Sequence, residues 1–304
     1  MEGAQMAAIT TTMLQLPNEL VSPIITKISD ESVIAKLSPS VPQVFLNSQY
    51  TVFTQEPEAE FVAEGANKSD GAETLAPVIA ETHKAVTTIR LTDEVQIADE
   101  DAMLGIIEAS RDKIALAGAR ALDYGIIHAV SPLQGTTVSG MTALANTANQ
   151  QTATSNPVAD VDTLPDAIIN AGYAPNGVAL ATTYANTLRK VRNNDGYRQF
   201  PEISLNPNDT SSVGGLAAAV SGTVQGRRVG YGTQNVGTKL LALAGDYSMI
   251  KWGIVRNMGI EVIRYGDPDG LGDLRRTNQI ALRAEVFYSW AVIDPLAFTA
   301  LKSA

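Results

Sequence analysis

Residues 50–91 read YTVFTQEPEAEFVAEGANKSDGAETLAPVIAETHKAVTTIRL, two strand-like stretches around a polar tip. Tyr50-Thr51-Val52-Phe53 and Glu60-Phe61-Val62 precede the tip, and Val86-Thr87-Thr88-Ile89 follows it. Because β-branched and aromatic residues dominate both sides, the pattern predicts a long β-hairpin. A two-stranded ribbon alone is at best marginally stable in water. We therefore expect this hairpin to rest on another chain or domain.

The segment before the hairpin, residues 1–48, is rich in Ala, Thr, Ser and Pro. Its prolines remove backbone donors and limit any helix to short pieces, so the segment is expected to form an extended arm with one or two short helices. Apolar residues such as Val21 and Ile25 have no compact pattern of their own. Two interpretations stay open: the arm packs on a neighbouring subunit, or it is a frayed chain end.

The segment after the hairpin predicts one long helix over Asp99–Val130. Its expected inner face carries residues at helical spacing: Met103, Ile107, Ser110, Ile114, Ala117, Ala121 and Gly125. At 1.5 Å per residue this helix would span roughly 45 Å. The polar linker Ser131–Pro157 then marks the best internal domain boundary.

A second unit of helices and strands follows the linker. Thr163-Leu164-Pro165-Asp166 predicts a helix start, and Gly177–Thr182 predicts a short buried strand. A helix with Tyr184, Leu188 and Val191 on its inner side is expected next. This order favours α+β or α/β layering. Further strands are expected at residues 240–244, 250–255, 259–263 and 280–293.

Composition excludes much of catalytic and metal chemistry. The chain has 304 residues, a net charge of −10, no cysteine and only two histidines, His83 and His128. Acidity disfavours tight nucleic-acid binding, and no catalytic, cofactor-binding or metal-binding motif is present. No signal or membrane span is expected. Asp267–Asp273 looks like a calcium loop, but it lacks the ligand spacing of one, and we favour a turn between two strands.

Short motifs spread along the chain resemble those of the phage capsid family, the major capsid proteins of tailed double-stranded DNA bacteriophages. They are Leu16-Pro17-Asn18-Glu19, Phe61-Val62-Ala63-Glu64-Gly65-Ala66-Asn67-Lys68, Asn193-Asn194-Asp195-Gly196-Tyr197-Arg198, Gly245-Asp246-Tyr247-Ser248 and Asp294-Pro295-Leu296-Ala297-Phe298. The resemblance implies the α+β phage capsid fold, with an N-terminal arm, a projecting E-loop hairpin, a peripheral domain containing a spine helix, and an axial domain.

The expected domain boundaries follow from placing those parts on the chain. They are an arm at 1–48, the E-loop at 49–89, the peripheral domain at 90–156, the axial domain at 157–251, peripheral strands at 252–293 and a C-terminal segment at 294–304. Because the motifs begin near the N-terminus, no fused scaffolding segment is expected.

The resemblance also implies a structural role and not an enzymatic one. Subunits would form hexamers and pentamers of an icosahedral head, assembled in the host cytoplasm and present in the virion. DNA would be enclosed rather than specifically bound, with separate scaffolding, decoration and portal proteins as possible partners and no membrane. Two alternatives stay open: an encapsulin-like nanocompartment, and a soluble enzyme of unknown chemistry. Neither a cofactor nor a metal is expected.

Three contacts between subunits are expected. The E-loop, with Phe61 and Val62, should lie on an adjacent subunit. Residues 193–200 and the small residues of 211–222 should lie near the axial tip, where copies converge; a local turn or surface loop is the alternative. In crosslinking relatives a lysine attacks an asparagine with a glutamate as base, and the matching residues here are Lys68, Asn278 and Glu285. A plain salt bridge of Lys68 at an interface is the alternative.

Overall fold

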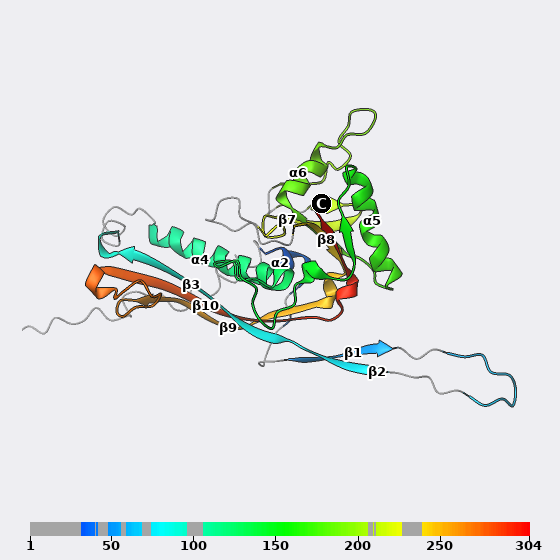
Figure 1. Ribbon diagram of the computed structural model, residues 1–304, viewed down its shortest axis with the longest axis horizontal. Helices are drawn as coiled ribbons and strands as arrows, with labels where there is room; N and C mark the ends of the chain where they lie inside the picture. Colours follow the sequence, from blue (N-terminus) through cyan, green and yellow to red (C-terminus); the bar gives the residue numbers. More distant parts are fainter. Residues whose placement is uncertain are drawn as a thin grey trace, which may run out of the picture.

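The computed structural model describes residues 32–39, 41, 48–55, 59–68, 74–95, 106–205, 209, 211–226 and 239–304. Most of the expected arm and the beginning of the expected long helix, residues 99–105, lie outside these ranges. The described residues form an elongated lower part, a second part above one of its ends, and a projecting ribbon (Figure 1).

A three-stranded antiparallel sheet runs along the lower part, in the order β3-β10-β9. Its strands are β3 (Glu81–Thr92), β9 (Ile250–Ile263) and β10 (Gln279–Val292). The central strand β10 pairs with β3 along the full length of β3, from Gln279↔Thr92 to Trp290↔Glu81. Ile280, Leu282, Val286, Tyr288 and Trp290 are buried, which gives β10 an apolar face.

Strand β9 corrects one expectation. The sequence predicted two strands, at 250–255 and 259–263, but β9 is continuous from Ile250 to Ile263. Its pairing with β10 shifts register between Ala284 and Val286 and between Phe287 and Tyr288. Bulges absorb extra residues without ending a strand, so residues 256–258, between the two expected strands, lie within one continuous strand.

Helix α4 (Ile106–Asp123) packs on this sheet and continues into one π-helical turn, Tyr124–His128. The expected inner face was only partly right. Ile114 and Gly125 are buried as predicted, and Ala115, Ala119, Leu122 and Asp123 are buried as well, whereas the predicted positions Ile107, Ser110, Ala117 and Ala121 are only half-buried. A helix that contacts two different parts of a protein buries more than one stripe. None of the helices in the described ranges is long and apolar enough to cross a bilayer.

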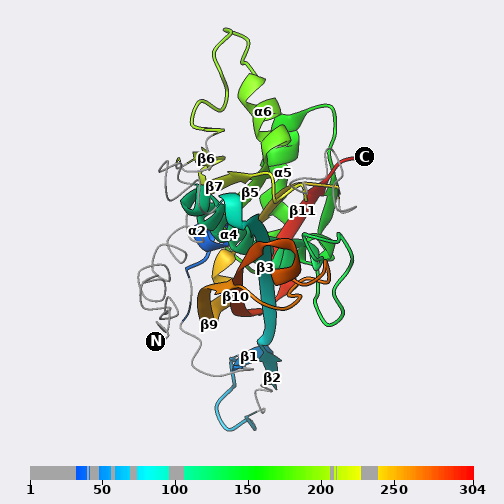
Figure 2. The ribbon, with the colours of Figure 1, turned by 90° about the vertical axis from the view of Figure 1, so that its left-hand side faces the viewer.

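The upper part is built on a six-stranded mixed sheet, in the order β4-β11-β8-β5-β7-β6. These strands are β4 (Gln150–Thr152), β5 (Gly177–Ala181), β6 (Ser211–Val213), β7 (Leu216–Ser221), β8 (Leu240–Gly245) and β11 (Phe298–Lys302). The predicted apolar strand at 177–182 is confirmed as β5, and all five of its residues are buried. Helices α5 (Pro157–Asn170) and α6 (Thr182–Lys190) pack on this sheet (Figure 2).

Helix α5 begins earlier than the sequence suggested. Asn156 is the N-cap, and its side chain accepts hydrogen bonds from the backbone N–H groups of Val158 and Ala159. Pro157 then occupies the first turn, where proline is tolerated. Pro165, taken from sequence as the helix start, lies inside the helix. Helix α6 buries Tyr184 and Leu188 as expected, whereas Val191 is half-buried at its end.

The C-terminal strand β11 enters the upper sheet between β8 and β4, antiparallel to β8 and parallel to β4. The segment expected as a separate C-terminal piece, and the end of the expected linker, therefore both belong to the six-stranded sheet. Gly245 permits this packing, because a Cβ there would lie 2.2 Å from the Phe298 ring. The other domain boundaries stay predictions.

Strands β1 (Gln49–Gln55) and β2 (Thr74–Ile79) form the ribbon, pairing antiparallel from Gln49↔Ile79. The chain then passes through Ala80 into β3. Because β3 pairs with β10 and not with β1, the ribbon ends at Ile79, rather than at residue 89 as expected for the hairpin. The long strand-like stretch was predicted correctly, but its second half lies in the body of the molecule.

Candidate assembly surfaces

The ribbon tip, residues 59–68, lies far from the rest of the chain (Figure 1). It turns at Ala63–Ala66, where Gly65 has a φ of 81° and Ala66 N–H donates to the Ala63 carbonyl at 3.0 Å. Phe61 at the tip is fully exposed, and Val62 is 39% exposed. A large aromatic side chain held in water by a marginally stable ribbon is a candidate contact site.

A buried carboxylate, Asp123, joins the arm to the body. The short helix α2 (Val33–Leu37) begins at Ser32, whose hydroxyl donates to Asp123 at 2.5 Å. The N–H groups of Val33 and Ile34 donate to the same carboxylate at 3.1 and 3.3 Å, and Thr223 Oγ1 donates at 2.7 Å. Burial raises the pKa of Asp123, and these four donors act against that rise.

His128 holds the same region from the π-helical turn. Its Nε2 lies 2.8 Å from the Thr223 carbonyl oxygen, and burial lowers the pKa of His128 to about 4. The arm is also tied to β9, because Trp252 Nε1 donates to the Ser38 carbonyl at 2.9 Å and Ser38 Oγ donates to the Ile250 carbonyl at 2.9 Å. The described arm residues are therefore fixed to both parts of the molecule.

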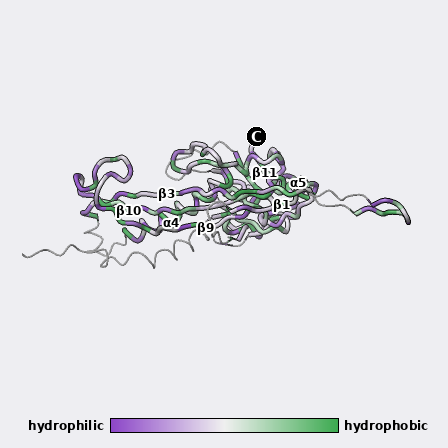
Figure 3. The backbone as a smooth tube through the Cα atoms, turned by 90° about the horizontal axis from the view of Figure 1, so that it is seen from below, coloured by the Kyte–Doolittle hydropathy of each residue, from purple (hydrophilic) through white to green (hydrophobic). Residues whose placement is uncertain are grey.

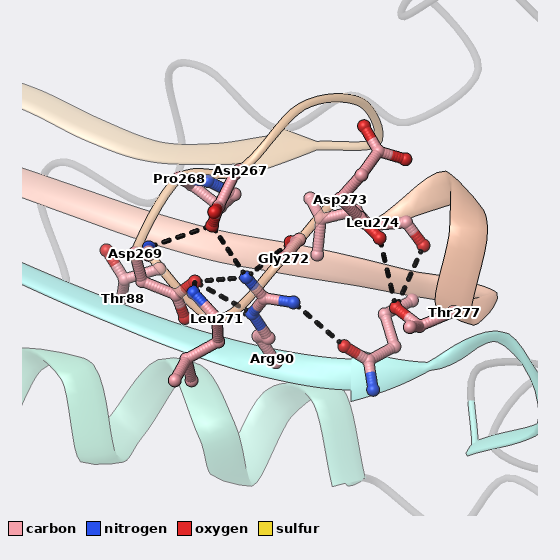
Figure 4. Close-up of polar contacts among 12 residues, drawn as sticks. Thr88, Arg90, Asp267, Pro268, Asp269, Leu271, Gly272, Asp273, Leu274 and Thr277 are labelled. Atoms are coloured by element: carbon pink, nitrogen blue, oxygen red, sulfur yellow. Dashed lines mark hydrogen bonds and ion pairs between the residues drawn. The ribbon is translucent and has the colours of Figure 1, made fainter.

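At the other end of the lower sheet, Arg90 on β3 holds the loop between β9 and β10 (Figure 4). Its Nε donates to both Asp269 oxygens at 2.9 and 2.8 Å, and its Nη2 donates to Asp267 at 3.1 Å and to the Gly272 carbonyl at 2.9 Å. Hydrogen bonding by Arg90 lowers the pKa of Asp269. Because both carboxylates face a guanidinium, the structure favours the turn interpretation of Asp267–Asp273.

The three residues of the expected crosslink lie apart within one chain. Lys68 is exposed at the ribbon tip, and Asn278 is exposed where the loop enters β10, with a φ of 51°. Glu285 lies further along β10 and forms an ion pair with Lys84 at 2.6 Å. Seven residues of extended strand separate Asn278 from Glu285, about 23 Å. A single subunit thus cannot bring both residues to one lysine.

The two segments expected at the axial tip differ in character. Residues 193–200 form a projecting turn beyond α6, in which Asn193 Oδ1 accepts from the Asp195 and Tyr197 N–H groups. Tyr197 is 73% exposed there. Residues 211–222 instead form the β6–β7 hairpin, whose Ala218, Ala219 and Val220 are buried within their own sheet. Small residues of this hairpin therefore serve internal packing, and its place near a symmetry axis stays a prediction.

Sequence reasoning identified the exposed tip but missed Asp123 and Arg90. The sequence does carry a signal for Asp123, which is the single acid within the mostly apolar run Ala121-Leu122-Asp123-Tyr124-Gly125-Ile126-Ile127. An acid in such a run is expected to be buried, and a buried carboxylate needs hydrogen-bond donors around it. No comparable signal marked Arg90, since its partners lie about 180 residues away in sequence, at separations of 177 for Asp267 and 179 for Asp269.

Comparisons with known proteins agree along nearly the whole chain. A family model described as "Phage capsid family" matches residues 14–303. A solved chain from Mycobacterium phage Ogopogo is 33% identical, with a TM-score of 0.82, covering 98% of this chain and 100% of that one. A chain from Gordonia phage Cozz is 27% identical, with a TM-score of 0.72, covering 90% and 87% respectively.

A more distant likeness shows the fold alone. The chain in a structure named "Capsid of empty GTA particle computed with C5 symmetry" is 16% identical, with a TM-score of 0.57, covering 91% of this chain and 90% of that one. No curated protein matched.

Proposed function

The chain belongs to the phage capsid family, and we propose that its copies form hexamers and pentamers of an icosahedral head around double-stranded DNA. The resemblance inferred from the short motifs is confirmed, as is the α+β phage capsid fold. The protein is a structural major capsid protein, a component of the virion.

The exposed ribbon formed by β1 and β2 supports a proposal for how subunits contact each other. Within the part of the chain that the structure describes, strands β1 and β2 have only each other as strand partners, and Leu75 and Ile79 are 49% and 57% exposed. Such a ribbon gains stability when another surface covers it. An adjacent subunit in a shell supplies that surface, which supports the expected contact of the E-loop with a neighbour.

The alternative of an encapsulin-like cargo shell is not favoured, since the similar chains come from phages. Assembly in the host cytoplasm with separate scaffolding, decoration and portal proteins belongs to the same proposal. Co-purification of particles from infected cells, followed by mass spectrometry, identifies such partners.

Electron microscopy of the particles tests the proposal. We expect icosahedral shells with hexameric and pentameric units, and a head from infected cells that protects double-stranded DNA from nuclease. Small shells filled with protein cargo would contradict the DNA-enclosing role. Subunits that stay monomeric at all concentrations, with and without phage partners, would contradict assembly itself.

A covalent bond between subunits is a second proposal for the same assembly. Lys68 and Asn278 are both exposed at outlying points of the chain, where other subunits can reach them. The neutral lysine nitrogen would attack the Asn278 side-chain carbonyl carbon, forming an amide as ammonia leaves, with a glutamate taking and returning the proton. Because Asn278 and Glu285 are far apart, Lys68 would need Asn278 from a second chain and Glu285 from a third.

Denaturing electrophoresis of purified particles tests the covalent bond. A ladder of multiples of 32.1 kDa that disappears in Lys68→Arg particles would support it. A single band in wild-type particles would reject it and leave the salt-bridge alternative for Lys68.

A further inference from the structure

The turn beyond α6 concentrates positive charge in an acidic chain. Four of the chain's 22 lysines and arginines lie within residues 189–198, beside one acid, Asp195, whereas the net charge of the whole chain is −10. This segment, the basic turn, projects beyond α6 at the end of the upper part farthest from the lower sheet (Figure 1, Figure 2). The ribbon tip also projects, but it mixes hydrophobic and hydrophilic residues and carries two acids and one base (Figure 3).

Local structure explains only part of this charge. Arg189 and Lys190 lie in the last turn of α6, where cations offset the negative end of the helix dipole. Arg192 and Arg198 lie beyond the helix. Both are exposed, and neither forms an ion pair with another residue that the structure describes. Their charge is therefore available to a ligand.

Hydrogen bonds within the basic turn hold the two arginines in place. Arg192 and Arg198 lie directly opposite each other in an isolated antiparallel bridge. Gly196, with a φ of 83°, closes the turn, and its N–H donates to the Asn193 carbonyl at 3.0 Å. Arg192 Nη1 donates to the Gly196 carbonyl at 2.7 Å, which orients the guanidinium. Like charges directly opposite each other destabilise a strand pair, so a bound anion would stabilise this arrangement.

Tyr197 adds an aromatic ring to the same turn, and this residue is 73% exposed. Exposed aromatic rings stack on nucleobases. Arginine guanidinium groups pair two N–H groups with the oxygens of a phosphate. A carboxylate would use the same donors, but only a nucleotide would also use the ring. The basic turn therefore suits phosphate groups and, where the ligand has one, a base.

Assembly would bring several basic turns together, because residues 193–200 are expected near the axial tip, where five or six subunits converge. Four basic residues and one acid give each turn three net positive charges. Charges closer than about 8 Å are only partly screened at physiological ionic strength, so the copies would repel each other. A compact anion with several negative charges on the axis would offset that repulsion and contact several copies at once.

We propose that the basic turns of one hexamer or pentamer bind a compact polyphosphate anion at their common axis, through Arg192 and Arg198. Tyr197 stacks on the base when the polyphosphate is a nucleotide. Double-stranded DNA fits less well, because its stable binding neutralises many phosphates along an extended surface, whereas the basic turn is one short segment of an acidic chain. This inference rests on the proposed function, because only assembly brings the copies together.

Thermal dissociation of particles, followed by light scattering, tests the binding. The probes are inorganic tripolyphosphate, deoxyadenosine triphosphate and a short duplex DNA, each compared with sodium chloride at equal ionic strength. Wild-type particles are compared with Arg198→Gln particles, and Arg198→Gln should leave the folding of the subunit unchanged because Arg198 is exposed. Arg256→Gln, which removes an exposed arginine on β9, is the matched control.

We expect tripolyphosphate and deoxyadenosine triphosphate to raise the dissociation temperature of wild-type and Arg256→Gln particles. Arg198→Gln should weaken the apparent affinity for both by about tenfold or more, because every copy around the axis loses a charge. Tyr197→Ala should weaken the binding of deoxyadenosine triphosphate and leave that of tripolyphosphate unchanged. The free subunit should respond weakly, since it presents a single turn.

Electron microscopy of the same particles gives a second readout. We expect density on the five- or six-fold axis with tripolyphosphate in wild-type particles and none in Arg198→Gln particles. Intact wild-type particles that respond to no polyphosphate, that respond as Arg198→Gln particles do, or that respond to duplex DNA alone would overturn the inference while leaving the proposed function in place. Basic turns that lie away from these axes would also overturn it. Failure of the wild-type chain to form particles, with and without phage partners, would instead count against the proposed function.

Discussion

The upper sheet and the ribbon are both made of paired strands, but they bury their apolar residues to different extents. In the upper sheet, β5 has strand partners on both sides and is buried throughout. In the ribbon, β1 and β2 pair only with each other among the described residues, and Leu75 and Ile79 stay about half exposed. Burial of apolar surface is the main favourable contribution to folding. The upper sheet obtains it within one chain, whereas the proposed contact with a neighbouring subunit would supply it to the ribbon.

The largest expected effect is a loss of folding stability in the upper sheet, which the same kind of substitution in the ribbon should not cause. Leu180 on β5 is fully buried, so Leu180→Ala should lower the free energy of unfolding of the free subunit by about 2–5 kcal/mol. Leu75→Ala on the ribbon should change it by less than about 0.5 kcal/mol. Urea unfolding of unassembled subunits measures both. Equal losses from the two variants would remove the distinction between the regions.

His128 makes the free energy of unfolding of the subunit depend on pH. Burial lowers the pKa of His128 to about 4, whereas the unfolded chain has an ordinary value of 6.5. The unfolded state therefore binds the proton first, and stability present above pH 6.5 is lost as pH falls toward 4, by about 3 kcal/mol. His128→Gln should flatten this slope in urea unfolding measured across that range.

Two controls sharpen the pH experiment. Asp123 acts in the opposite direction, because its raised pKa lets the folded state take up a proton first as pH falls. The slopes of wild type and His128→Gln are therefore compared with each other. His83→Gln should keep most of the wild-type slope, since His83 is less buried. Identical slopes in wild type and His128→Gln would contradict the assignment.

Asp123→Asn tests how the arm is held. The amide would place N–H donors among four groups that already donate, leaving some unpaired in a buried site at a cost of about 2 kcal/mol. Faster hydrogen exchange should appear at the Val33 and Ile34 amides. The exposed Asp195→Asn is the matched control. Unchanged exchange at these amides would show that the arm does not depend on the carboxylate.

The smallest effect is expected at the β9–β10 loop. Lysine cannot reproduce the forked contacts of Arg90 with Asp267 and Asp269. Arg90→Lys should speed hydrogen exchange in residues 266–274 without a measurable shift in the urea midpoint, because the pair lies at the surface. Arg256→Lys, an exposed arginine on β9, is the control. A change confined to the core strands would contradict this role.

The local sequence pattern predicted the structure correctly where the residues within a segment are enough to show whether it is buried. The run Gly177–Thr182 is apolar throughout and became β5, and the spacing of Tyr184 and Leu188 matched the buried side of α6. Local pattern failed where tertiary contacts changed the outcome. Pro165 is accommodated inside α5, and β9 continues with bulges through residues 256–258, which separate the two expected strands.

Some parts of the candidate assembly surfaces could likewise be predicted from the sequence, and others could not. Phe61 and its acidic neighbours could be identified from sequence, because a polar tip between two strand-like stretches projects by itself. A groove of about 650 Å³ beside β3 could not, because its lining residues come from β3, α4, the loop after α4 and β10, which only the packing of the fold brings together. Asp123 likewise gains its role from Ser32 and Thr223, which lie 91 and 100 residues away.

The sequence alone determined the strand-forming ribbon, the long helix, the buried strands of the second unit, the lack of thiol chemistry and, through its motifs, the capsid family. These properties depend on residue type and on spacings of a few residues, which the chain carries in any conformation. Only the tertiary structure decided that β3 leaves the ribbon to pair with β10, and that β11 returns to complete the upper sheet. The reason is physical: strand pairing and burial are contacts between distant segments, and many pairings satisfy the same local pattern until all the segments pack together.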